Sequence, residues 1–192
     1  MSTYSIVIFV ESRLQKIQMT EKQILELLAA WENIPLLTKE LAAKPADFDV
    51  LVKTALYSAD AKSWRAAYIV DLIHDNHPEL LLPYLNEMIL QLKEEKNNGK
   101  KRHFLKLISL NKPGEEHHGF LFDYCLNAFT SAKEAIAVRV NAMQILYNIT
   151  ETEPGLKPEI LAIIEHEMEY HATAGILSRG RKLAAKLHAQ IQ

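Results

Sequence analysis

The sequence has 192 residues, of which 48% are hydrophobic and 24% charged, and its formal net charge is −2. These values are ordinary for a soluble folded domain. Cys125 is the only cysteine, which excludes an intrachain disulfide and a metal site built on two cysteines. No secretion signal is visible, so the sequence predicts a cytoplasmic protein.

The first apolar segment, Tyr4 to Val10, is rich in β-branched residues and is typical of a strand. It is too short to cross a bilayer, and no association with a membrane is predicted. A sequence typical of the start of a helix begins at Met19. We therefore expect residues 1–18 to be a non-core N-terminal extension and residues 19–192 to form a single repeat domain.

The next elements are predicted to be three helices. Thr20 and Gln23 have capping-box spacing, which indicates a helix start at this point. Pro35 disfavours a helical conformation in the residue before it, so the first helix should end there. A second helix is expected over residues 36–43. Asp47 is a favoured N-cap residue and predicts the start of a third helix.

The remaining helices are predicted to fall into pairs joined by short linkers. The expected helices cover residues 64–73, 78–92, 101–110, 119–129, 135–149, 158–170 and about 175 to the end.

Three arginines stand at a fixed spacing of 37 residues: Arg65, Arg102 and Arg139 (102 − 65 = 37; 139 − 102 = 37). Each opens a segment whose apolar residues recur at helical spacing. A fixed period of 20 to 50 residues indicates a solenoid, in which each unit stacks on its neighbours.

Two copies of the repeat are clear, WRAAYIVDLI from Trp64 and VRVNAMQILYNI from Val138. Both copies share one pattern: an apolar residue, an arginine, two variable residues, and then a pair of apolar or small residues. This pattern resembles the second helix of HEAT repeats. Asp60 resembles their inter-helix aspartate. The likeness covers residues 20–190 and extends to small stand-alone bacterial HEAT-like proteins.

This resemblance implies an all-α fold, a right-handed α-α superhelix of four to five antiparallel helix pairs. The second helices, which begin near Arg65, Arg102, Arg139 and Arg179, should then line its concave side. We interpret Arg65, Arg139 and Asp60 as a structural ladder that keeps the repeats in register.

Charge is unevenly distributed along the chain. Residues 93–112 hold seven Lys/Arg against two Glu, and the last twenty residues hold four Lys/Arg and no acid. Such blocks are usually solvated helix faces and sometimes nucleic-acid surfaces. The residues predicted to bind a partner on the concave surface are Arg102, Lys100, Lys101, Asp71, Asn141 and Asn148.

The sequence predicts no catalytic residue, no cofactor and no metal site. It has no GxSxG motif, phosphate-binding loop or nucleotide fingerprint. His166 and His171 resemble a zinc-protease pair, but their i, i+5 spacing places them about 140° apart on a helix. Neither residues 115–118 nor the pair His74 and His77 offers an identified third ligand.

We therefore expect a non-catalytic scaffold that binds a protein or peptide on its concave surface. The alternative is a nucleic-acid-binding protein related to HEAT-like alkylation-repair proteins, although the overall acidity disfavours it. An enzyme is the third hypothesis. Adenylosuccinate lyase activity is disfavoured because the serine-rich SSxMPxKxN loop of that enzyme is missing.

Overall fold

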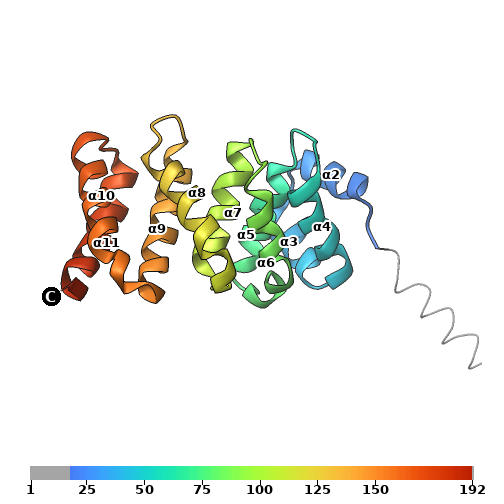
Figure 1. The fold of residues 1–192 in the computed structure, drawn as a ribbon. Coiled ribbons are helices and arrows are strands. Elements are labelled where there is room, and N and C mark those ends of the chain that lie inside the picture. The colour runs from blue at the N-terminus through green and yellow to red at the C-terminus, as the bar shows by residue number, and fades with distance from the viewer. Residues whose placement is uncertain (1–17, 192) are drawn as a thin grey trace, which may run out of the picture. The chain divides into compact units, whose positions relative to one another are not determined.

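The computed structural model describes residues 18–191, and this part of the chain is all-helical (Figure 1). The predicted strand at Tyr4 to Val10 lies outside the described residues. Within them the chain forms ten α-helices and four single-turn 3-10 helices, and no strand. The all-α fold class is confirmed, and ten helices match the upper end of the predicted four to five pairs. No helix of this part is long and apolar enough to cross a bilayer.

The chain divides into two compact units after Ile73. The helices of the first unit are α2 (Glu21–Ala30), α3 (Ile34–Ala42), α4 (Pro45–Tyr57) and α5 (Trp64–His74), whose last residue belongs to the second unit. Those of the second unit are α6 (Leu85–Gln91), α7 (Asn98–Leu110), α8 (His118–Thr130), α9 (Ile136–Thr152), α10 (Lys157–Tyr170) and α11 (Ala174–Ile191). The predicted domain limits stay a prediction.

In the first unit, the capping box of α2 is confirmed. The backbone N–H of Gln23 donates to the Thr20 hydroxyl, and the Gln23 side chain accepts from the Thr20 backbone N–H at 2.9 Å. The helix ends at Trp31, which adopts a left-handed conformation with φ of 53°. Trp31 then packs against Trp64 and Tyr68 of α5, with ring centroids 6.0 and 5.6 Å apart.

The predicted start of α4 is wrong. Its N-cap is Lys44, and Pro45 is the first helical residue, where proline is favoured because that N–H has no helical partner. Asp47 lies inside the first turn and is buried. Its carboxylate accepts a hydrogen bond of 2.8 Å from the backbone N–H of Met19, so it fixes the chain that enters α2.

The predicted helix over residues 78–92 is shorter than expected. Pro78 and Pro83 each open a single 3-10 turn, and the α-helix α6 begins only at Leu85. Proline lacks a backbone N–H and clashes with the preceding turn, so a second proline five residues on prevents one continuous helix.

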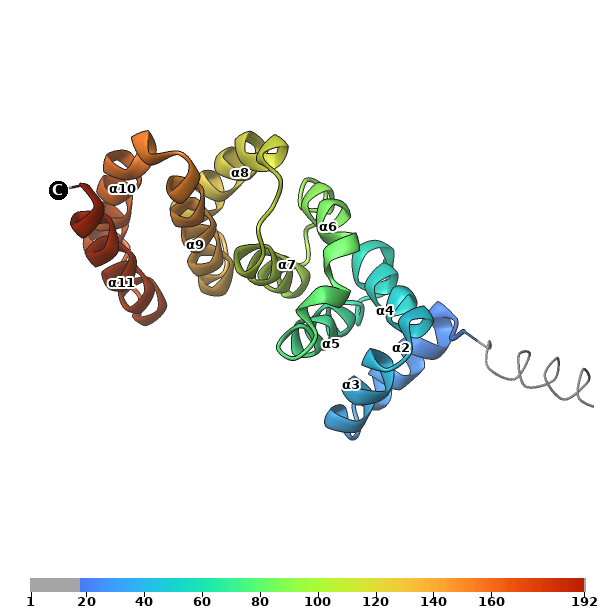
Figure 2. The same ribbon diagram turned by 90° about the horizontal axis from the view of Figure 1, so that it is seen from below.

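Two rows of helices make up the second unit. α9 packs against α7 on one side and α11 on the other, while α8 and α10 pack across α9. In Figure 2, α7, α9 and α11 lie along one side of this unit and α6, α8 and α10 along the other. The core between the rows is apolar and includes Phe104, Leu121, Phe129, Met143, Leu146, Ile164 and Leu183, all buried.

The two C-terminal helices approach closely at Gly180. A Cβ atom at this position would lie 2.7 Å from the sulfur of Met168 on α10. Glycine thus allows α11 to lie close against the C-terminal half of α10.

Candidate functional site

The three consecutive basic residues of α7 have different surroundings. Lys100 and Lys101 are buried, with only 4% and 9% of their surface exposed, and their ammonium groups pair with Glu95 at 3.4 Å and Glu134 at 2.5 Å. The structure therefore places these two lysines in the interior rather than on an open surface. Arg102 is exposed. Its binding role, like theirs, stays a prediction.

The arginines interpreted as structural bind backbone carbonyl oxygens at helix ends. Arg65 donates from Nη1 to Leu28 O at 2.7 Å near the end of α2. Arg139 donates from Nε to Phe129 O at 2.8 Å near the end of α8. The last carbonyls of a helix have no partner within it and carry partial negative charge, which a guanidinium satisfies. Arg139 is also ion-paired with Glu167 at 2.6 Å.

The two aspartates singled out from the sequence, Asp60 and Asp71, both lie in the first unit, and their surroundings differ. Asp60 caps the turn before α5, where its carboxylate accepts from the backbone N–H of Lys62 at 2.7 Å. Asp71, predicted to face a partner, is buried within α5. The other predicted binding residues lie on α7 and α9 of the second unit.

A chain of hydrogen bonds crosses the second unit from α11 to α7. Arg179 of α11 donates to Gln144 Oε1 at 2.5 Å, and Gln144 donates to Asn148 Oδ1 at 2.8 Å. Asn148 in turn donates to the backbone oxygen of Ser109 on α7 at 2.8 Å. We call these four residues the polar relay. It fixes the register of three successive second helices at their polar surface.

The polar relay continues into a wider polar surface. Asn141 donates to the backbone oxygen of Arg102 at 3.0 Å, so the exposed arginine lies beside α9. Lys186 of α11 lies over the ring of Tyr147, with Nζ 5.4 Å from the centroid. Lys182, exposed, follows Arg179 by three residues and so shares its side of the helix. We define the second-helix face as Arg102, Asn141, Gln144, Asn148, Arg179, Lys182 and Lys186.

A recess of about 590 Å³ opens beside this face. Ser109 and Asn148, the last two members of the polar relay, form part of its wall. Five leucine and isoleucine residues line it as well, and the remaining lining residues are Asn111, Lys112, Pro113, His118, Glu151 and Thr152. A volume of this size lies in the range of small-molecule sites and also accommodates a large side chain.

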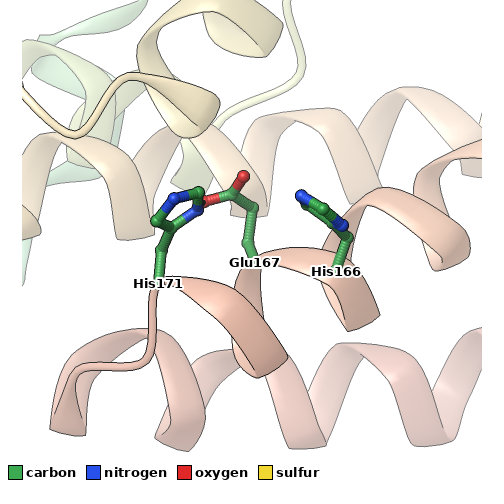
Figure 3. Close-up of side chains that lie close together, drawn as sticks. All are labelled: His166, Glu167 and His171. Atoms are coloured by element: carbon green, nitrogen blue, oxygen red, sulfur yellow. Dashed lines mark hydrogen bonds and ion pairs between the residues drawn. The ribbon is translucent and has the colours of Figure 1, made fainter.

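A second cluster lies at the C-terminal end of α10, where His166, Glu167 and His171 bring one potential ligand atom each within 4.8 Å (Figure 3). The prediction that the two histidines point too far apart to share a metal is wrong. Around the helix axis, Glu167 lies between the positions of the two histidines. His171 is the C-cap residue, and with φ of −130° its backbone is no longer helical. The ring centroids are only 6.2 Å apart.

The other groups considered for metal or catalytic chemistry do not form such sites in the described part of the chain. His166, Glu167 and His171 are the one set of three potential ligands that converges there, so residues 115–118 and the pair His74 and His77 lack a third. Cys125 is buried, and burial strongly raises the pKa of its thiol. A thiol kept protonated is a poor nucleophile.

Sequence reasoning missed four members of the second-helix face as binding residues: Gln144, Arg179, Lys182 and Lys186. A signal was present, because Gln144 follows Asn141 by three residues and lies on the same side of the helix. It also missed Glu167 as the centre of the cluster on α10. The i, i+4 spacing of Glu167 and His171 is the signal that finds it.

Comparison with protein families found a match to a model described as HEAT repeat domain, over residues 21–187. Comparison with curated proteins and with solved structures gave no match. The matched range covers all ten α-helices except the last turn of α11.

Proposed function

The chain belongs to the HEAT repeat family and is a repeat-type helical scaffold, and from this premise we propose that it binds an acidic segment of a partner protein on the second-helix face. The binding is non-catalytic. The observation that carries the proposal is the polar relay, because it orders the half-buried side chains of Arg179, Gln144 and Asn148 and joins three adjacent helices.

Charge supports an acidic partner. Arg102, Arg179, Lys182 and Lys186 contribute four cations to the face, and α11 contains no acidic residue that would neutralise its own. The side chains of Lys182 and Lys186 are exposed. Complementary charge at such a surface increases the rate of association and disfavours partners of the wrong sign.

The amides support a polypeptide. Gln144 and Asn148 are held in fixed orientations by the polar relay, so little side-chain entropy is lost when a partner binds. Amide side chains both donate and accept hydrogen bonds, which suits an extended backbone with alternating N–H and C=O groups. Solenoids present long surfaces of this kind without a closed pocket.

The neighbouring recess favours a protein over a nucleic acid. Five of its thirteen lining residues are leucine or isoleucine, and it opens beside Asn148. An apolar side chain of the partner fits against these leucine and isoleucine residues as an anchor, and a phosphate backbone has no apolar group that does so. The same proposal assigns the protein to the cytoplasm, which its single, unbridged Cys125 supports.

The test is affinity capture from an extract of the source cells with the wild-type protein and a Lys182→Glu/Lys186→Glu variant. The matched control is Lys39→Glu/Lys62→Glu, which makes the same charge change at exposed lysines of the first unit. We expect the α11 variant to lose partner proteins that the control retains. Equal recovery by all three proteins would contradict the proposal.

The nucleic-acid alternative is decided by a salt titration with duplex DNA. Phosphate contacts make affinity fall steeply as salt rises, with a log–log slope of about −0.9 for each phosphate neutralised. The proposal expects no binding at low salt. Binding with a steep slope that Lys182→Glu/Lys186→Glu reduces would replace the protein partner with nucleic acid on the same face.

A further inference from the structure

We propose that His166, Glu167 and His171 form a binding site for a divalent cation of the zinc class at the C-terminal end of α10. The site does not depend on the second-helix face or on any partner. Its donor set, two imidazoles and one carboxylate, is one that zinc sites with three protein ligands use.

Glu167 is the fixed ligand of this site. Its side chain is 3% exposed, and Oε2 accepts from Arg139 at 2.6 Å and lies 3.0 Å from Nδ1 of His171. Arg139 is itself held by Phe129 O. The carboxylate is thus oriented by neighbours that are oriented in turn, the arrangement that holds metal ligands in place.

The other oxygen of Glu167 is available to a cation. No side chain or backbone group of the described residues donates a hydrogen bond to Oε1, although the residue is buried. Figure 3 shows the carboxylate between the two imidazole rings. An oxygen without a donor can accept a cation without the loss of an existing hydrogen bond.

The two histidines are adjustable ligands. His166 makes no hydrogen bond to the described residues and rests against the ring of Tyr170, with centroids 4.7 Å apart. Both histidines are exposed, so each ring can rotate without disturbing the core. A cation between His171 and Glu167 takes the place of the hydrogen bond that now joins them.

The separations fit a small transition-metal ion. Bonds of 2.0–2.1 Å in a tetrahedral site place ligand atoms about 3.3 Å apart. The pair His171 and Glu167, at 3.0 Å, is already near this value, and the widest separation in the cluster is 4.8 Å. Rotation of the exposed His166 ring closes that gap. Calcium and magnesium prefer oxygen ligands and are disfavoured by two imidazoles.

Arg139 limits the strength of the site. Its guanidinium carries positive charge 2.6 Å from Oε2 and opposes a second cation nearby. With three protein ligands, the fourth position is left to water or to a group from another molecule. We therefore expect weaker binding than at a closed four-ligand structural zinc site.

The test is isothermal titration of the full chain with ZnCl₂, compared with a His166→Ala/His171→Ala variant. The matched control is His77→Ala/His188→Ala, because these two histidines also lie beside glutamates, at 3.4 and 2.9 Å. We expect one zinc per chain, a loss of affinity of roughly tenfold or more in the cluster variant, and none in the control.

Three results would overturn the site: no zinc binding by the wild type, equal binding by the cluster variant, or an equal loss in the control. Thermal unfolding without metal checks that both variants fold, as expected for exposed positions. NMR of the imidazole signals gives a second, independent measurement. Zinc should shift the resonances of His166 and His171 first, and a first shift at His77 or His188 would also overturn the proposal.

Discussion

Two basic regions of the second unit look alike in sequence and differ in the structure. In α7, Lys100 and Lys101 are buried and paired with Glu95 and Glu134. In α11, Arg181, Lys182 and Lys186 are exposed, and the helix has no acidic residue. Charge density alone therefore does not distinguish residues that hold the fold from residues available to a partner. The position of the nearest acidic residue distinguishes the two groups.

The first way to test this comparison is to remove a deeply buried cation, Arg139. Arg139→Met leaves Glu167 buried without its guanidinium and Phe129 O without a donor. Removal of one partner from a buried pair costs about 3–5 kcal/mol. Both side chains of this pair are at most 5% exposed, so the full range applies. Denaturant unfolding measures the loss.

The control for Arg139→Met is Arg181→Met on the exposed surface of α11. A surface substitution of this kind changes the free energy of unfolding by no more than about 0.5 kcal/mol. If Arg139→Met cost no more than Arg181→Met, the interpretation of Arg139 as a structural residue would be wrong.

A smaller effect is expected in the polar relay, which joins the two regions through α9. Asn148→Ala removes the donor to Ser109 O and the acceptor for Gln144. One hydrogen bond contributes about 0.5–1.5 kcal/mol, so we expect a loss of about 1 kcal/mol in denaturant unfolding.

Asn127→Ala is the control for the polar relay. Asn127 donates to Asp123 O within its own helix and is exposed, so it joins no second helix. We expect a loss of only a few tenths of a kcal/mol from it. Equal losses from the two asparagines would mean that the relay adds nothing beyond a local helix contact.

The repeat architecture could be predicted from the sequence because the signals are local and periodic. The spacing of Arg65 and Arg139 marks equivalent helix starts, and both arginines bind carbonyls at the end of a preceding helix. The capping box at Thr20 was equally local. Boundaries failed where two signals competed, as at Asp47, where Pro45 began the helix instead.

The candidate site was harder to predict because its residues are joined by contacts distant in sequence. Nothing local shows that Lys101 meets Glu134, 33 residues away. Nor does the sequence show that Arg179 meets Gln144, 35 residues away. The cluster at Glu167 was missed for a different reason. An ideal helix was assumed through His171, whereas α10 ends at Tyr170.

The most direct measurement is the free energy of unfolding of Lys101→Met and Lys182→Met, determined by denaturant under identical conditions. The Lys101–Glu134 pair is 11% and 24% exposed, between the surface and buried cases, so Lys101→Met should cost about 1–3 kcal/mol. Lys182→Met should stay within about 0.5 kcal/mol of the wild type. Equal losses from the two lysines would contradict the division between inward-facing and available cations.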